Sequence, residues 1–184
     1  MAPVASGERR QPARLAPSAR DLEATSRMTA TSPVLRLYER LHRWPGGLWL
    51  FSRAVCFKAP YFASISPRIR RLAPGTCEAT LRHRRHVTNH LGTVHAIALC
   101  NLAELVAGLA TDATLPPTMR WIPKGMTVRY LRKAEGTMRA KATLAHPLEV
   151  AEQGRELPVD VSVRDPAGEE VFSARILMWV SPRR

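Results

Sequence analysis

The chain has 184 residues, of which 45% are hydrophobic, and a formal net charge of +13. That length is enough for one sizeable hydrophobic core and too short for two comfortable ones. No uninterrupted apolar run reaches the roughly 18 residues of a membrane span, so no span is expected. The charge favours an anionic partner, namely nucleic acid, an acidic membrane surface or a phosphorylated ligand, although an Arg-rich solvated surface explains it equally well.

Residues 1–31 are rich in Ala, Arg, Pro and Ser and have no apolar period. This composition predicts a disordered, basic N-terminal segment. It contains no hydrophobic signal core, and Met28 is an alternative start. Much of the charge lies towards this end, since residues 1–75 hold 13 Lys and Arg against 4 Asp and Glu.

Residues 32–59 are expected to form a helical flap. Ser32 and Pro33 suit the N-cap and the first helical position, and Pro45-Gly46-Gly47 ends the first helix. A second short helix is expected over about residues 48–58. We favour packing of this pair over the rest of the domain. A weak membrane-surface contact through residues 1–58, using Trp44 and Trp49, is the alternative.

Six apolar runs with period two predict strands. The first begins at Phe62, the second runs from Glu78 to Val87, and the turn at 73–75 between them predicts a hairpin. The later runs cover residues 126–130, 138–144, 157–163 and 172–180. The sequence Asp165-Pro166-Ala167-Gly168 predicts a tight turn between the last two.

Residues 96–110 are apolar on nearly every side, which is typical of a buried helix. One buried helix followed by an antiparallel meander is an α+β arrangement. We therefore expect residues 60–184 to form one domain, in which an antiparallel sheet wraps round this central helix.

The three cysteines, Cys56, Cys77 and Cys100, are widely spaced and form no CxxC pair. A disulfide framework, a zinc site or any other metal site is therefore not expected. A reducing, cytoplasmic location fits this usage of cysteine.

The densest functional pattern precedes the buried helix. Gly92 permits a tight backbone turn, and that turn brings the polar side chains of Asn89 and His95 close together. The backbone N–H groups that follow, beginning at Ala96, are orphan donors of a helix N-terminus. Such donors can polarise a carbonyl or hold a developing oxyanion.

Glu104 is the second candidate, because a carboxylate inside a buried helix is costly unless it is paired or used in chemistry. It follows His95 by nine residues, which places the two about 13 Å apart along the axis and roughly half a turn out of phase. The two cannot meet on one helix. A two-fold homodimer would bring Glu104 of one copy to Asn89 and His95 of the other.

The pattern Asn89-x-x-Gly92-Thr93-x-His95, followed by Glu104, resembles the motif of phenylacetyl-CoA-type hotdog thioesterases. The longer string 89–108, with 121–128, is similar to an uncharacterised hotdog subgroup. The resemblance covers roughly residues 60–181. Where the family commonly has His-Gly-Gly, this chain has His95-Ala96-Ile97, which leaves an amide available.

The resemblance implies a hotdog fold and an acyl-CoA thioester hydrolase, with a CoA thioester as substrate and no other cofactor. Glu104 would be the base or nucleophile, and Asn89 and His95 would position water and substrate. Ala96 would supply its N–H, and Gly92 fits the family's turn. A homodimer or a dimer of dimers is expected.

Five basic residues after the helix are candidates for binding the CoA phosphates, although each could equally belong to a solvated strand face. They are Arg120, Lys124, Arg129, Arg132 and Lys133. The basic run 82–86 is ambiguous in the same way, since it could meet the CoA nucleotide or protect a sheet edge.

Two other functions compete with hydrolysis. One is a non-catalytic hotdog module that binds acyl-CoA or an acylated carrier. The other is a basic protein that binds nucleic acid or a membrane surface, suggested by the charge of +13. The sequence has no aromatic–basic interleaving and no recognition helix, so a nucleic-acid partner is not expected.

Overall fold

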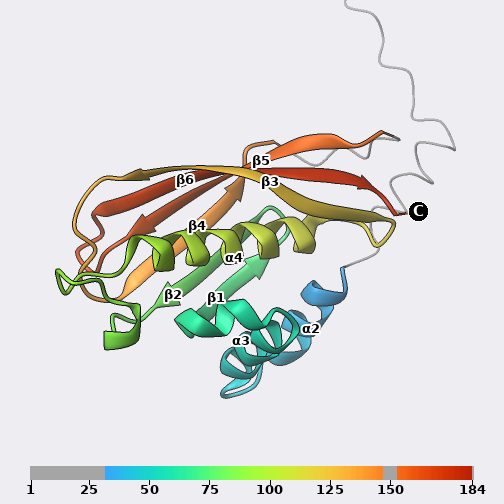
Figure 1. Cartoon of the computed structure of the whole chain (residues 1–184). Coiled ribbons are helices and arrows are strands. Elements are labelled where there is room, and N and C mark those ends of the chain that lie inside the picture. Colours follow the sequence, from blue (N-terminus) through green and yellow to red (C-terminus); the bar gives the residue numbers. More distant parts are fainter. Residues whose placement is uncertain (1–31, 147–152, 184) are drawn as a thin grey trace, which may run out of the picture.

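The computed structural model describes residues 32–146 and 153–183, and the predicted segment 1–31 lies outside them. Six antiparallel strands in these residues form one sheet in the order β1-β2-β4-β5-β6-β3, and helix α4 (Ala96–Thr114) lies along one face (Figure 1). The strands are β1 (Arg68–Ala73), β2 (Thr76–Leu81), β3 (Met119–Tyr130), β4 (Met138–Leu144), β5 (Arg155–Arg164) and β6 (Glu170–Pro182). The predicted α+β arrangement is confirmed.

Helix α4 is the core of the fold. The side chains of Leu102, Val106 and Ala110 are completely buried between the helix and the sheet. Among the described residues, α4 is the one helix long and apolar enough to cross a membrane, yet 72% of its apolar window is buried inside the protein. It runs four residues past the predicted end at 110, because buried Thr111 and Ala113 continue the apolar face.

The first two strands are shorter than the sequence predicted. The prediction of a strand over residues 62–65 is wrong, because these residues belong to the 3-10 helix η1 (Pro60–Ile65). Pro60 is preset for a helical turn, and the strand begins only after Pro67, which has no N–H to give to a ladder. The second strand stops at Leu81, where its partner β4 begins, and the basic run continues as a loop and the short 3-10 helix η2 (Arg85–Val87).

Strand β3 begins at Met119, seven residues before the predicted run. It pairs with β6 only, and its register shifts between Pro123 and Gly125. A proline and a bulge are tolerated at a sheet edge, but they hide the alternation that identifies a strand in sequence. This leaves the other side of β3 open as one edge of the sheet.

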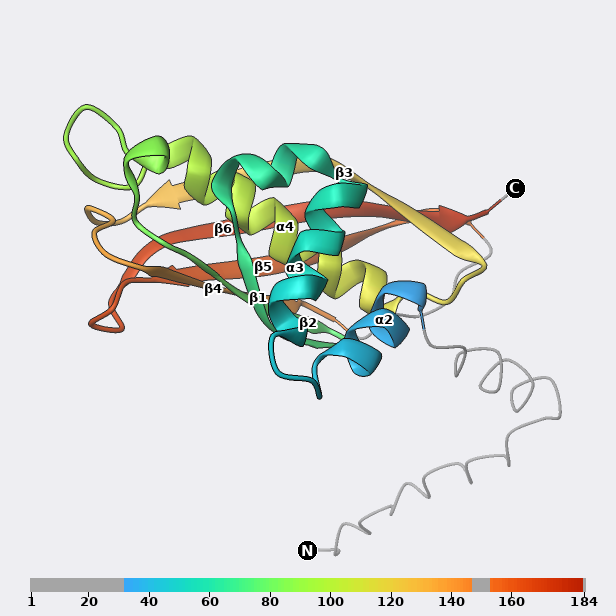
Figure 2. The ribbon, with the colours of Figure 1, turned by 90° about the horizontal axis from the view of Figure 1, so that it is seen from below.

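Two N-terminal helices cover the β1 end of the molecule (Figure 2). They are α2 (Pro33–Leu41) and α3 (Gly47–Lys58). The Oγ of Ser32 accepts a hydrogen bond from the N–H of Leu35 at 3.2 Å, so the predicted N-cap is confirmed. Phe51 is fully buried, and Ser52 Oγ accepts from the N–H of Ile69 in β1 at 2.9 Å. The helices therefore pack on the sheet as a flap, as favoured.

The exposed surface of this flap carries large apolar side chains among its charged ones. Trp44 and Trp49, on which a membrane-surface contact would depend, are 71% and 49% exposed, and Phe57 is 90% exposed. Packing against β1 thus accounts for only one side of α3.

Candidate active site

The loop before α4 is built by the side chain of Asn89. Its Oδ1 accepts from the N–H groups of Leu91 (3.0 Å) and Thr93 (3.1 Å), and its Nδ2 donates to Thr93 Oγ1 at 2.9 Å. Gly92 adopts φ +75°, a left-handed conformation that favours glycine. Asn89 is therefore committed to holding the loop, which the sequence did not predict.

His83 ties this loop to the segment after β3. Its Nδ1 accepts from the N–H of Gly136 at 3.0 Å, so the neutral ring carries its proton on Nε2 and donates to the carbonyl of Gly92 at 2.9 Å. The N–H of Val94 donates to the carbonyl of Ala134 at 2.8 Å, which strengthens the same junction. In the sequence His83 lies within a basic run, and only the fold reveals that its ring joins the loop to the segment after β3.

His95 is the N-cap of α4. Its Nδ1 accepts from the N–H of Ile97 at 3.1 Å, and its own N–H donates to the carbonyl of Val87 at 2.8 Å. The ring is exposed, and a neutral ring in this arrangement presents Nε2–H outwards. The N–H of Ala96 has no acceptor within residues 32–146 and 153–183, so one donor remains open at the helix N-terminus.

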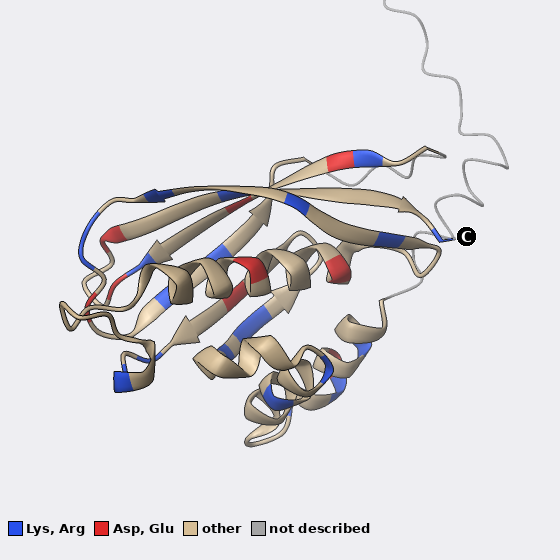
Figure 3. Ribbon diagram, viewed as in Figure 1, with Lys and Arg blue, Asp and Glu red and all other residues tan. Residues whose placement is uncertain are grey.

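Glu104 lies midway along α4 and is partly buried. The helix carries two acidic residues, Glu104 and Asp112, and no basic one (Figure 3). Within the part of the chain that the structure describes, the Glu104 carboxylate makes no ion pair and no hydrogen bond. A carboxylate that is partly desolvated and unpaired is unusual unless a further partner meets it.

The stripe of α4 that holds Glu104 is bracketed on both sides. On one side, Cys100 Sγ lies 3.3 Å from the hydroxyl of Tyr130 in β3. On the other side, Asn101 Nδ2 donates to Ser64 Oγ of η1 at 3.1 Å. Ser64 gives its own proton to the carbonyl of Tyr61 at 2.7 Å, which fixes the amide orientation of Asn101.

Gly108 lets β3 approach α4 one turn beyond Glu104. A Cβ at position 108 would lie 2.8 Å from the indole ring of Trp121. Gly108 therefore makes room for β3 of the same chain. Along β3, Trp121, Met126 and Val128 are partly buried against the core.

The Tyr130–Cys100 contact gives a prediction about titration. The hydrogen bond to Cys100, with a contribution from desolvation, raises the pKa of Tyr130 to about 12, because the bond favours the protonated phenol. The difference between the ultraviolet titration curves of the native protein and of the Tyr130→Phe variant should show this pKa. In the Cys100→Ala background the same difference should move towards the ordinary tyrosine value of about 10.

Tyr61→Phe, which removes a 72% exposed phenol, is the matched control, and circular dichroism at each pH restricts the measurement to folded protein. A Tyr130 pKa that is the same with and without Cys100 would contradict the assigned cause.

The five CoA-binding candidates are not gathered at Glu104. Lys124 pairs with Glu156 at 2.9 Å and lies over the ring of Trp179, and Arg132 pairs with Glu169 at 3.4 Å. Arg120, Lys124 and Arg129 point from β3 to the sheet face opposite α4. Lys133 is exposed in the loop after β3.

An antiparallel sheet wrapped round one central helix is the hotdog fold, which the chain shares with solved structures. More narrowly, the chain belongs to the family described as Domain of unknown function (DUF4442), whose model matches residues 47–180. No curated protein matches the chain.

Several solved structures share this fold. The structural-genomics crystal structure APC5556 is 43% identical, and the match covers 82% of this chain and 98% of that one with a TM-score of 0.69. Thioesterase HI1161 from Haemophilus influenzae is 17% identical over 66% of this chain and 82% of its own, with a TM-score of 0.58. A thioesterase family protein from Silicibacter pomeroyi is 18% identical over 72% and 96%, with a TM-score of 0.59. At these low identities the last two show the fold.

Proposed function

We propose that the protein hydrolyses an acyl-CoA thioester at a homodimer interface, with Glu104 as general base or nucleophile. The observation that carries this proposal is the Glu104 carboxylate midway along α4, which is partly buried, has no partner among the described residues and lies between the Cys100–Tyr130 and Asn101–Ser64 contacts. A partly buried carboxylate of this kind is a candidate active-site group. The names of the thioesterases that share the fold support the reaction class.

A second copy of the chain is needed for the chemistry. The open N–H of Ala96 and the carboxylate of Glu104 lie eight residues apart on one rigid helix, or about 12 Å along its axis, so they cannot act on one bond. A two-fold axis beside α4 would bring Glu104 of one protomer to the Ala96 amide of its partner. Ile97 (56% exposed) and Tyr130 (52% exposed) flank this stripe and would be covered.

In the general-base form of the reaction, the Glu104 carboxylate takes a proton from water, and the resulting hydroxide adds to the thioester carbonyl. The N–H of Ala96 stabilises the oxyanion of the tetrahedral intermediate. Collapse of the intermediate breaks the C–S bond, and the thiolate leaves with the proton that Glu104 held. In the nucleophilic form, the carboxylate adds to the thioester carbonyl, the C–S bond breaks and the thiolate leaves, and water then hydrolyses the acyl-enzyme anhydride to the free acid and the carboxylate.

The polar residues before the helix contribute by holding the loop and its groups in position. Asn89 keeps the 88–94 loop closed through its hydrogen bonds. The closed loop places His95, whose Nε2–H is available to a water or to the substrate. These roles refine the expectation that Asn89 and His95 both contact the substrate, since the amide of Asn89 is already in use.

Thiol release from a panel of acyl-CoA esters of increasing chain length, followed with a chromogenic thiol reagent, tests the proposal. We expect turnover of at least one ester. If no ester is hydrolysed, the proposal is wrong. Binding of CoA esters without release, detected by thermal shift, would instead identify a non-catalytic module for acyl-CoA or an acylated carrier.

A further inference from the structure

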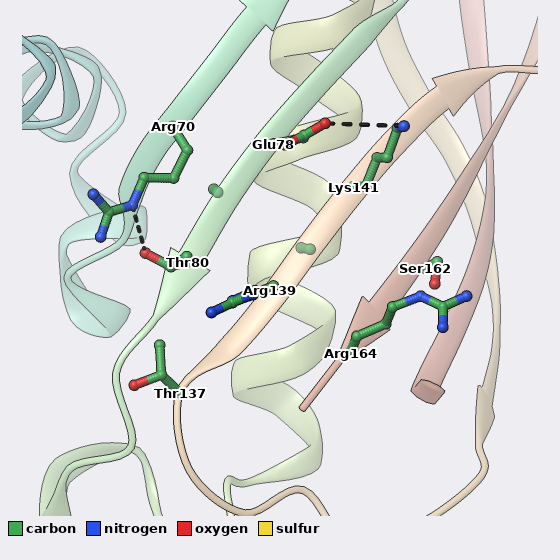
Figure 4. A pocket seen from close by; sticks show the side chains of 10 residues that line it. Arg70, Glu78, Thr80, Thr137, Arg139, Lys141, Ser162 and Arg164 are labelled. Atoms are coloured by element: carbon green, nitrogen blue, oxygen red, sulfur yellow. Dashed lines mark hydrogen bonds and ion pairs between the residues drawn. The ribbon is translucent and has the colours of Figure 1, made fainter. Parts of the chain in front are cut away.

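The sheet face opposite α4 carries a row of arginines that crosses four strands (Figure 4). Arg139 in β4 lies opposite Thr80 in β2 on one side and opposite Arg164 in β5 on the other. Arg70 of β1 extends the row, because its Nε donates to Thr80 Oγ1 at 3.2 Å. Three guanidinium groups thus share one row of the sheet.

The neighbouring rows contain ion pairs, whereas the described residues form none in this row. In the next row Lys141 lies 3.9 Å from Glu78, and in the row after it Arg175 lies 2.7 Å from Asp160. Within the described ranges, Arg70, Arg139 and Arg164 form no ion pair.

The immediate neighbours of Arg164 do not neutralise it. Glu170 stands opposite it in the register, but the guanidinium Nη1 donates to the carbonyl of Gly168 at 2.8 Å. Arg139 and Arg164 are direct cross-strand partners, and like charges in that position destabilise a sheet. In Figure 4 the two guanidinium groups point to opposite sides, and an anion bound in the hollow would let them converge.

A bulge in the backbone of β1 directs the side chain of Arg70 into the row. The β1–β2 register shifts between Ile69 and Arg71, so Arg70 is the extra residue of a bulge. Bulges redirect a side chain relative to a regular strand. In this case the redirected guanidinium lies beside Thr80 rather than following the strand outwards (Figure 4).

The row lies in a hollow of about 650 Å³. Hydroxyl groups of Thr80, Thr137 and Ser162 also line it. The Oγ of Ser162 is buried and has no hydrogen-bond partner among the described residues. A second hollow of about 590 Å³ adjoins it and shares Lys141 and Ser162. Glu78 also lines the first hollow, where it pairs with Lys141, and the remaining polar groups of that lining are basic or hydroxyl groups that match the oxygens of a phosphate.

We propose that this hollow binds a phosphate-bearing small molecule, with a phosphate held among Arg70, Arg139 and Arg164. Planar guanidinium groups bind phosphate oxygens in pairs, and the hydroxyl groups complete the coordination. The sheet separates the hollow from α4, so this site is independent of the proposed hydrolysis. The phosphate belongs either to the nucleotide part of CoA or to a free phosphorylated metabolite.

Isothermal titration calorimetry at low ionic strength tests the site with pyrophosphate, ADP, CoA and adenosine as probes. We expect the phosphorylated probes to bind native protein and adenosine not to bind. Arg139→Gln should weaken binding at least about tenfold, since it removes a charge-assisted bidentate donor. Arg139→Lys should be intermediate. Arg40→Gln on α2 makes the same change in net charge far from the hollow and should leave binding unchanged.

The pattern of probes identifies the source of the phosphate. Equal binding of pyrophosphate, ADP and CoA would indicate a general phosphate site, whereas much tighter binding of both ADP and CoA than of pyrophosphate would indicate the nucleotide part of CoA. The unliganded Arg139→Gln protein should be as stable as native protein or more stable, because repulsion from Arg164 is relieved. Absence of binding by every phosphorylated probe would overturn the proposal, as would unchanged binding in both Arg139→Gln and Arg164→Gln.

Discussion

Replacing Glu104 by Ala or Gln should lower the rate of thiol release from the best acyl-CoA ester by about 10²–10⁴-fold, the usual contribution of a general acid–base group. The loss should appear in kcat more than in KM, because the carboxylate acts on water rather than on the acyl chain. The measurement is steady-state kinetics on native and variant protein. Folding should survive, since Glu104 has no partner within the described residues whose contact would be lost.

Asp112→Asn is the matched control. It removes the other acidic side chain of α4, two turns further along and also partly buried, and should leave turnover near the native rate. Native-like turnover by Glu104→Ala would contradict the assignment of the catalytic group. An equal loss in both variants would indicate that the net charge of the helix matters rather than this carboxylate.

Replacing Ile97 by Glu should convert the proposed dimer to a folded monomer and remove thiol release. Ile97 lies in the first turn of α4, is 56% exposed and adjoins the open N–H of Ala96. In the proposed dimer it is covered, and burying an unpaired charge there costs several kcal/mol. The mass from sedimentation analysis and the rate of turnover, measured on the same samples, should fall together.

Trp44→Glu supplies the control for the dimer prediction. Trp44 is 71% exposed but lies in the α2–α3 turn, away from the α4 stripe (Figure 2). The same apolar-to-acidic change there should alter neither mass nor turnover. A native protein that is monomeric and fully active would refute the need for a second copy.

The fold could be predicted where periodicity and burial agree. The run 96–110 is apolar all round, and the runs 138–144, 157–163 and 172–180 alternate cleanly, so each lies within an observed element. Prediction failed where proline intervened. Residues 62–65 form a 3-10 turn instead of a strand, and the first half of β3 was missed because Pro123 and Gly125 interrupt its alternation.

The site was predicted unevenly, for a physical reason. The spacing of His95 and Glu104 depends only on helix geometry, and the structure places His95 at the cap and Glu104 midway along α4. The partners of Asn89 and the role of His83 depend on loop hydrogen bonds, which no periodicity encodes. The orientation of Arg129 away from α4 depends on strand register, and a bulge of one residue reverses the face of the sheet to which each following side chain points.

The bulge at Pro123–Gly125 also bears on how copies of the chain associate. An exposed sheet edge is a template on which further strands can add without limit, and filaments follow. Pro123 offers no N–H and the register breaks beside it, so the Met119–Gly125 half of the edge cannot template a regular neighbour. Only the stretch 126–130 remains regular, so a small part of this edge is left on which a further strand could add.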